Sequence, residues 1–198
     1  EENNHDDFSL SSINADRCLK EAEFYFPLNK ASTKQLSHFL SNHRNSSPFR
    51  AKTVAQVKLP IQATLKGMMH GFIDLIFEHS GRYYVCDYKS NYLGDDFNDY
   101  QAESLQENIE QHHYDLQYLI YSLALHRYLK ITLPDYQVER DFGGVYYLYF
   151  RGMTNDPKYR GAGVYFRKIT ITEIEQLDRI FSGELAQLTE SVKGTAND

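Results

Sequence analysis

The sequence predicts an α/β fold in which a mixed sheet is flanked by helices. Two mainly apolar segments, 68–79 and 82–90, are separated by a short turn and predict a pair of strands. Apolar residues then recur at helical spacing over about 97–130. Because strand patterns and helix patterns also occur on both sides of this region, we expect helices to pack against one sheet.

The first part of the chain predicts one strand and one helix before the hairpin. Residues 21–29 alternate in polarity, which predicts a strand that ends at Pro27. Residues 32–43 begin with serine and threonine and continue with apolar residues at helical spacing, as expected of a capped helix. After a loop, 54–67 predicts one or two short strands, and Pro60 favours an edge or a break there.

The second part of the chain continues this mixed pattern. Residues 91–100 are rich in turn formers and predict a loop. The helical segment that follows is expected to break near His112 and His113. The last expected elements are a strand over 136–151 with a Gly-Gly irregularity, a loop, a strand over 164–169, and a helix over 172–185 with a threonine cap.

The length and the end segments suggest one domain. A chain of 198 residues can build one domain with a substantial core. We expect 20–190 to form this domain, 1–19 to be a polar and partly disordered lead-in, and 191–198 to be a disordered tail. The first residue is glutamate rather than methionine, so the sequence is expected to be the C-terminal fragment of a longer chain.

Composition limits the class of protein. The net charge of -6 argues against a basic surface over the whole domain, although a local basic groove remains compatible with it. The two cysteines, Cys18 and Cys86, suggest reduced residues of a cytoplasmic protein, with Cys86 packed in a strand. No apolar stretch approaches the roughly 18 to 20 residues of a membrane span, and no signal peptide is visible.

Charged residues interrupt the two strands of the predicted hairpin. Because side chains alternate along a strand, Asp74 is expected to share a face with Phe72 and Ile76. By the same rule, Asp87 and Lys89 share one face of the second strand. An unpaired carboxylate is costly to bury, so these groups need partners.

The register of the hairpin places the two aspartates opposite each other. A two-residue turn at Ser80 and Gly81 sets the pairing, and counting outward brings Asp74 to Asp87. Opposed residues have Cβ atoms about 4.5–5.5 Å apart, where like charges repel. A divalent cation between the carboxylates would convert this repulsion into coordination, and oxygen ligands suit Mg²⁺, Mn²⁺ or Ca²⁺.

Lys89 completes a set of groups suited to metal-assisted hydrolysis of phosphodiesters. It lies two residues after Asp87 on the same face, where it could hold a phosphate oxygen or the attacking water. The residues also allow a simpler interpretation, in which Asp87 and Lys89 form an ion pair on a solvated face and Asp74 is a capped or paired polar residue. The spacing alone leaves both open.

Three motifs in order resemble the PD-(D/E)XK nuclease superfamily. The segments "GFIDLIF" and "DYKSNYLG" are similar to its active-site hairpin. The segment "HYDLQYLIYSLALHRYL" resembles the Q-x-x-x-Y helix of its RecB-like branch, with Gln117 and Tyr121 at the matching positions, and "FGGVYYLYFRGM" completes the pattern. The resemblance is strongest from about Gly71 to Gly152 and implies a restriction-endonuclease-like core.

The resemblance also implies roles for single residues. Asp74 and Asp87 would bind Mg²⁺, together with the main-chain carbonyl of Tyr88, and Lys89 would be the catalytic lysine. Mn²⁺ or Ca²⁺ could substitute in binding.

Two residues of the helix motif are expected to position DNA. Gln117 and Tyr121 are four residues apart and therefore project from one helical face. For Tyr121, packing within a helix rich in tyrosine and leucine is an equally open interpretation.

One feature of the family is not found in this sequence. Members of the RecB-like branch carry a further metal-binding histidine before the first core strand, but His5, His38 and His43 do not fit that motif. We therefore expect the fragment to begin after this ligand, and a site without it is expected to bind metal more weakly, so that both an active and an inactive fragment stay open. Glu21 and Glu23 are the nearest acidic candidates, with Glu23 the candidate to approach the metal.

Further roles follow from the resemblance at the level of the whole assembly. It implies a Mg²⁺-dependent exodeoxyribonuclease within a RecBCD-type helicase–nuclease that repairs double-strand breaks. The partners would be the single-stranded end of unwound DNA, the gamma and alpha subunits of exodeoxyribonuclease V, and ATP-driven helicase domains of the same parent chain. Arg151 could reach a phosphate, or form a surface ion pair. The alternatives are a catalytically inactive nuclease-fold interaction module and, more remotely, a nuclease for RNA.

Overall fold

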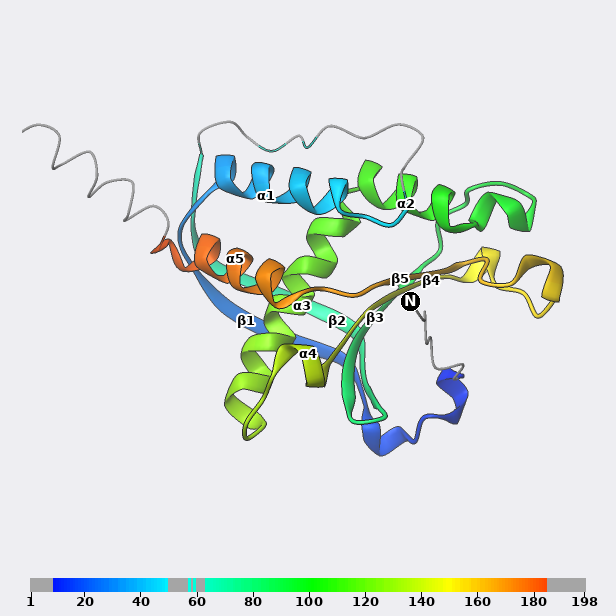
Figure 1. Cartoon of the computed structure of the whole chain (residues 1–198), viewed down its shortest axis with the longest axis horizontal. Helices are drawn as coiled ribbons and strands as arrows, with labels where there is room; N and C mark the ends of the chain where they lie inside the picture. Colours follow the sequence, from blue (N-terminus) through cyan, green and yellow to red (C-terminus); the bar gives the residue numbers. More distant parts are fainter. Residues whose placement is uncertain (1–8, 50–56, 58, 60–62, 185–198) are drawn as a thin grey trace, which may run out of the picture.

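One mixed sheet forms the centre of the protein (Figure 1). The computed structural model describes residues 9–49, 57, 59 and 63–184. Within these residues the sheet has five strands in the order β1-β2-β3-β4-β5. The strands are β1 (Cys18–Ser32), β2 (Thr64–His79), β3 (Arg82–Lys89), β4 (Phe142–Tyr149) and β5 (Val164–Arg167).

Helices connect and flank the strands, so the predicted mixed sheet with flanking helices is confirmed. The α-helices are α1 (Thr33–Asn45), α2 (Ala102–Gln111), α3 (Tyr114–Thr132), α4 (Val138–Asp141) and α5 (Ile171–Ser182). The short 3₁₀ helices are η1 (Leu10–Ser12), η2 (Ala15–Arg17), η3 (Phe97–Tyr100), η4 (Phe150–Gly152) and η5 (Pro157–Tyr159). No helix in this described part of the chain has the length and apolar character needed to cross a membrane.

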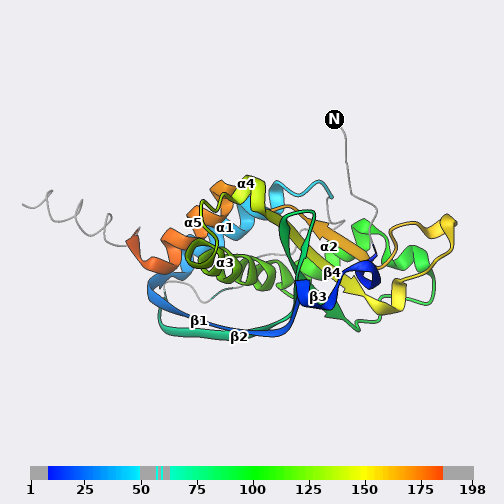
Figure 2. The ribbon, with the colours of Figure 1, turned by 90° about the horizontal axis from the view of Figure 1, so that it is seen from below.

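The topology places the only parallel strand pair of the described sheet between β3 and β4. A parallel pair needs a long crossover, and here the crossover contains η3, α2, α3 and α4. Figure 2 shows the consequence for the layers: α3 lies between the long β1–β2 ribbon and α5. The helix that contains the Q-x-x-x-Y motif is therefore a central element of the fold.

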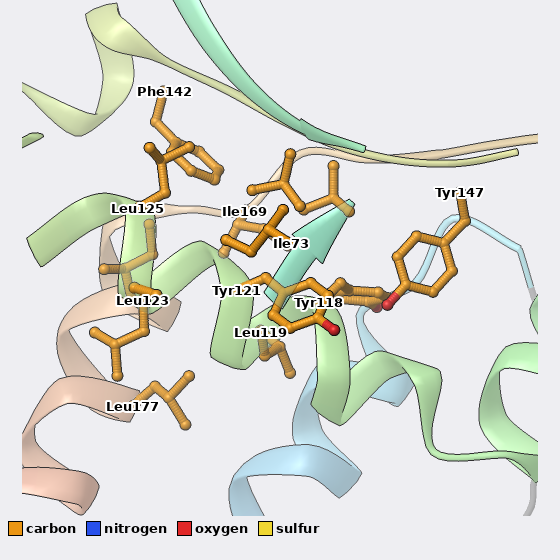
Figure 3. Close-up of a cluster of buried hydrophobic side chains, with 14 of the residues drawn as sticks. Ile73, Tyr118, Leu119, Tyr121, Leu123, Leu125, Phe142, Tyr147, Ile169 and Leu177 are labelled. Atoms are coloured by element: carbon orange, nitrogen blue, oxygen red, sulfur yellow. The ribbon is translucent and has the colours of Figure 1, made fainter. Parts of the chain in front are cut away.

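The main core lies between the sheet and these helices. Figure 3 shows side chains of α3 meeting residues from β2, β4 and α5. A smaller core lies on the other face of β2, β3 and β4, around Phe77, Tyr84 and Cys86. The labelled side chains of the main core are Ile73, Tyr118, Leu119, Tyr121, Leu123, Leu125, Phe142, Tyr147, Ile169 and Leu177.

The first predicted strand is longer than expected. β1 runs through Pro27, which pairs with Met68, and ends at Ser32, so the prediction that the strand ends at Pro27 is wrong. β1 is the edge strand, where a residue without an N–H can be tolerated. The capped helix is confirmed, because the Ser32 side chain accepts a hydrogen bond from the backbone N–H of Gln35.

The predicted strand over 136–151 is wrong in its first half. Residues 138–141 form α4 instead, and the strand begins at Phe142. The Gly-Gly irregularity is confirmed: a Cβ on Gly143 would lie 2.2 Å from the ring of Tyr84, and Gly144 has a φ of +134°. Glycine is therefore required where β4 passes the Tyr84 ring of β3.

Other boundaries differ by small amounts. The predicted helix break is confirmed, since α2 and α3 meet at His112 and His113, and His113 has a φ of +55°. α5 begins before the predicted segment, with Thr170 as its cap. Half of the strand prediction over 54–67, including Pro60, lies outside the described residues, as do the start of the lead-in and the tail over 191–198. The last part of that predicted segment, 64–67, belongs to β2.

A buried histidine joins three helices. His43 of α1 pairs through Nδ1 with Glu173 Oε1 of α5 at 2.5 Å and through Nε2 with the Tyr118 hydroxyl of α3 at 2.7 Å. Burial opposes ionisation of Glu173, but the hydrogen bond and charge of His43 and the donors of Thr170 lower its pKa from 4.5 to about 2. The lowered pKa means that the ionised carboxylate stabilises the folded state.

We expect this contact to make folding stability depend on pH in acid. A carboxyl with a lowered folded pKa contributes stability above its unfolded pKa, and this contribution is lost as the pH falls from about 4.5 to about 2. Glu173→Gln should remove that part of the pH dependence while keeping the cap of α5. Urea unfolding across this range measures the difference, and Glu175→Gln, at an exposed site on α5, is the matched control. A Glu173→Gln variant with the same acid dependence as the parent protein would contradict the assignment.

Candidate metal centre

The predicted active-site hairpin opens into a fork. The antiparallel β2–β3 ladder has the predicted register and extends from the turn to the pair Leu75–Cys86. Beyond that pair, β2 continues along β1, whereas β3 continues along β4. Asp74 and Asp87 are the next residues on the two strands, so both lie at the point where the strands separate.

The alternation of side chains along β2 is interrupted at Asp74. Ile73 belongs to the main core, but Leu75 belongs to the smaller core on the other face of the sheet. In a regular strand these two residues would share a face. The prediction that Phe72, Asp74 and Ile76 share one face is therefore wrong, since Phe72 is exposed and Ile76 packs against the main core.

The neighbouring strand has an irregularity at the same level. The β1–β2 ladder contains Lys20–Leu75 and Ala22–Ile73, and Glu21 lies between them beside Asp74. Glu21 has a φ of +50°, which is unfavourable for a residue with a side chain. Such backbone costs on the order of 1–3 kcal/mol and persists where the surrounding structure imposes it. The kink is thus shared by β1 and β2.

Asp74 replaces the missing partner of a backbone group on β3. Its Oδ2 accepts a hydrogen bond of 2.9 Å from the backbone N–H of Tyr88. In a continuous ladder this N–H would face β2 backbone, and leaving it unpaired would be costly. The side chain of Asp74 therefore bridges the fork, and its carboxylate is held near residues 87–89.

Asp87 is a buried carboxylate that lies next to Lys89. The whole residue is only 4% exposed, and Lys89 Nζ lies 2.5 Å from its Oδ2. This contact is an ion pair, and Oδ2 accepts no further hydrogen bond from the described residues. Burial raises the pKa of Asp87, the hydrogen-bonding contact and the charge of Lys89 oppose this, and the charge of Asp74 adds to it.

Lys89 is held by the helix that carries the second motif. Its Nζ donates to Gln117 Oε1 at 2.9 Å and lies 4.1 Å from the ring centre of Tyr114 and 4.6 Å from that of Tyr147. The hydroxyl of Tyr147 donates to the same Gln117 oxygen at 2.8 Å, and Gln117 Nε2 donates to the Tyr121 hydroxyl at 2.9 Å. The structure therefore brings Gln117 and Tyr121 to the aspartates and the lysine.

Tyr114 and Tyr147 were not predicted as site residues. Tyr147 lies directly beside Asp87 in the parallel β3–β4 ladder. Its position in the alternating "VYYLY" of β4 predicts an inward-facing residue, but a parallel pairing across a long crossover cannot be counted from the sequence. Tyr114 comes from the start of α3 and is placed by the packing of that helix.

The remaining candidates lie at different distances from the fork. Glu23 is exposed and accepts hydrogen bonds from the Tyr25 hydroxyl and from His70, which lower its pKa. The structure thus gives Glu23 partners of its own and does not bring it to Asp87. Arg151 is close to the end of β3, because its Nε donates to the carbonyl of Ser90 at 2.9 Å.

The donors present at the fork fit a hard divalent cation. They are the carboxylate of Asp74 and a buried oxygen of Asp87 that pairs with Lys89. Oxygen ligands of this kind suit Mg²⁺, Mn²⁺ or Ca²⁺. No group of three or more histidine, cysteine or acidic residues that could hold a metal occurs in the part of the chain that the structure describes. Two carboxylates, rather than a larger cluster, are the side-chain ligands available here.

Comparison with known proteins places this geometry in a family. A sequence model of the PD-(D/E)XK nuclease superfamily matches residues 11–197. The chain is 39% identical over 174 residues to the RecBCD enzyme subunit RecB of Haemophilus influenzae, covering 87% of this chain and 13% of that protein. It is 39% identical over 177 residues to RecB of Escherichia coli, covering 88% of this chain and 14% of that protein.

These matches fit a RecB-type nuclease domain, and the chain spans 13% and 14% of the length of these two relatives. A shorter match to RecB of Mycobacterium tuberculosis has 46% identity over 90 residues. The family match extends over nearly the whole chain and agrees with the mixed sheet, the forked hairpin and the helix that meets it. The chain therefore belongs to the PD-(D/E)XK nuclease superfamily.

Proposed function

We propose that this domain is a divalent-metal-dependent DNA nuclease that hydrolyses phosphodiester bonds as part of a RecBCD-type helicase–nuclease. The observation that carries the proposal is the buried carboxylate of Asp87, located at a strand fork beside Asp74 and paired with Lys89. The ion pair with Lys89 compensates one negative charge, but Asp74 and Asp87 carry two when both are ionised. A bound divalent cation would compensate the remaining charge.

The metal ligands in this proposal are Asp74, Asp87 and the main-chain carbonyl of Tyr88. Mg²⁺ is the proposed ion, with Mn²⁺ or Ca²⁺ as substitutes in binding. When bound, the ion would lower the pKa of a bound water and polarise a phosphoryl oxygen. The chain's own contribution is to hold two carboxylates together despite their repulsion, which the kink at Asp74 and the burial of Asp87 achieve.

Lys89 is the proposed catalytic cation. Its ammonium is fixed by Gln117 and lies over two tyrosine rings, so its position is set before a phosphate arrives. A prepositioned positive charge stabilises the negative charge that develops on the phosphate in the transition state. Gln117 and Tyr121 act by positioning Lys89 and, in this proposal, the DNA beside it. Arg151 is a further candidate for a phosphate contact.

The second candidate function is an inactive nuclease-fold interaction module. The 2.5 Å contact between Asp87 and Lys89 favours it, because an ion pair by itself could hold the hairpin together. The two functions differ in their response to metal: a module held by the ion pair gains nothing from a divalent cation. Metal titration therefore separates them.

The proposed setting is a larger assembly in the cytoplasm. The relatives are named as subunits of the RecBCD enzyme, and this chain corresponds to a small part of them. Affinity for nucleic acid grows with the number of phosphates that lysine and arginine neutralise, and the net charge of this chain is -6. We propose that helicase domains of the parent chain, with the gamma and alpha subunits, deliver the single-stranded end of unwound DNA to this domain.

Divalent metal should stabilise the protein against heat, and Asp87→Asn should abolish the effect. A ligand that binds only the folded state adds about 2.7 kcal/mol at a hundredfold excess over its dissociation constant. Thermal melting during Mg²⁺ and Mn²⁺ titration measures this gain. Glu23→Gln is the matched control and should retain the full shift, because Glu23 is engaged with Tyr25 and His70. An unchanged melting temperature of the parent protein at saturating metal would favour the interaction module.

Lys89→Gln should separate metal binding from catalysis. We expect saturable metal stabilisation to remain, since Lys89 is not a ligand, while cleavage of linear single-stranded DNA falls by about 100-fold or more. Cleavage under single-turnover conditions with Mg²⁺ measures the loss. The control is Lys158→Gln, because Lys158 is an exposed lysine that contacts Tyr159. Cleavage by Lys89→Gln at the parent rate would argue against a catalytic role for this lysine.

A further inference from the structure

An exposed pair of aromatic rings lies at the open end of the fork. The rings of Tyr88 and Phe150 are stacked, with centroids 5.1 Å apart and planes inclined by 19°. Tyr88 is 38% exposed and Phe150 is 56% exposed. A stacked pair with this much exposed surface presents aromatic area to solvent rather than to the core.

The pair is joined to the proposed metal centre through the backbone. Tyr88 lies between Asp87 and Lys89, and its N–H donates to the Asp74 carboxylate. Phe150 follows Tyr149, which is the partner of Lys89 in the β3–β4 ladder. Each ring is therefore carried by a residue next to one that forms or flanks the site.

The same sheet face is packed differently farther from the fork. Phe77 and Tyr84 stack with centroids 4.9 Å apart and are buried in the smaller core. Tyr88 continues the row of Tyr84 and Cys86 on β3 and lies at its exposed end. Burial explains why aromatic residues occupy the inner positions, because apolar area removed from water is stabilising at about 25 cal/mol per Å². It explains much less of why aromatic residues occupy the exposed positions, and the side chain of Phe150 has no polar atom that would favour its exposure.

A positive charge lies on the Phe150 side of the pair, whereas the Asp74 carboxylate lies at the Tyr88 backbone. Arg151 follows Phe150, is exposed, and is anchored through Nε to the Ser90 carbonyl just after Lys89. An arginine offers five N–H donors in a planar arrangement suited to phosphate. Aromatic faces combined with a positive charge are the means by which proteins bind single-stranded nucleic acid.

We propose that Tyr88 and Phe150 form a stacking platform for an unpaired base of the DNA strand at the metal centre, with Arg151 beside the adjacent phosphate. This inference rests on the proposed nuclease function and names the residues that would hold an unpaired base beside the metal centre. In a duplex the base faces are occupied by neighbouring bases, so the platform favours a single strand over a duplex. Stacking is also tolerant of sequence, because every base has an aromatic face.

The test measures binding without cleavage. Fluorescence anisotropy in EDTA compares a short labelled single strand with an abasic strand of the same length and the same number of phosphates. Phe150→Leu, which keeps an apolar side chain but removes the ring, should weaken binding of the normal strand by roughly 5- to 100-fold. It should leave the weaker binding of the abasic strand unchanged. Phe150→Tyr should bind the normal strand like the parent protein.

A matched variant controls for the loss of any exposed ring. Tyr128→Leu removes an aromatic ring of similar exposure, 58%, from α3 and should not change binding. The proposal is overturned if Phe150→Leu binds the normal strand as the parent protein does, if it loses affinity equally for the abasic strand, or if the parent protein binds neither strand. A melting curve shows whether each variant is folded. If Phe150→Leu does not fold, Phe150→Tyr still tests the proposal, because it must bind the normal strand as the parent protein does.

The same design keeps the platform and the nuclease function distinguishable. Binding of the normal strand that depends on Phe150, together with no cleavage in Mg²⁺ by this domain or by a chain extended toward the N-terminus, would uphold the platform and contradict the nuclease proposal. Cleavage in Mg²⁺ with binding that does not depend on Phe150 would uphold the nuclease and overturn the platform.

Discussion

The separation of β2 from β3 is the constraint on which the candidate site depends. A continuous ladder would pair Asp74 with Asp87 at the closest distance that a sheet allows, where two carboxylates repel. The structure avoids this by ending the ladder at Leu75–Cys86 and giving the next N–H of β3, that of Tyr88, to the Asp74 side chain. The fork thereby leaves one carboxylate half-buried, buries the other, and holds both where the two strands separate.

The rest of the fold maintains this fork. β3 continues beside β4 as a parallel pair, and the crossover between them brings α3 over the fork. α3 then supplies Gln117, whose side-chain oxygen accepts from both Lys89 and Tyr147. Because one amide group connects β3, β4 and α3, a change in the position of any of the three would displace the lysine from Asp87.

Buried charges outside the site fix the helices that surround it. Arg44 of α1 binds both oxygens of Asp115 at the start of α3 and also donates to the Glu110 carbonyl of α2. Both charged side chains are almost completely buried, so each is costly without the other. The pair holds α1 against the break between α2 and α3, and that break sets the direction in which α3 approaches the sheet.

The sequence by itself determined the local elements and the register of the hairpin. Alternation, a short turn and a capping serine are local features, so they predicted β2, β3 and α1, and the three ordered motifs identified the family. Only the tertiary structure decided that alternation breaks at Asp74, that Tyr147 and Tyr114 enclose Lys89, and that Glu23 turns to His70. These features depend on strand divergence, on a parallel pairing across a long crossover and on the approach of a helix, none of which is set by residues close together in the chain.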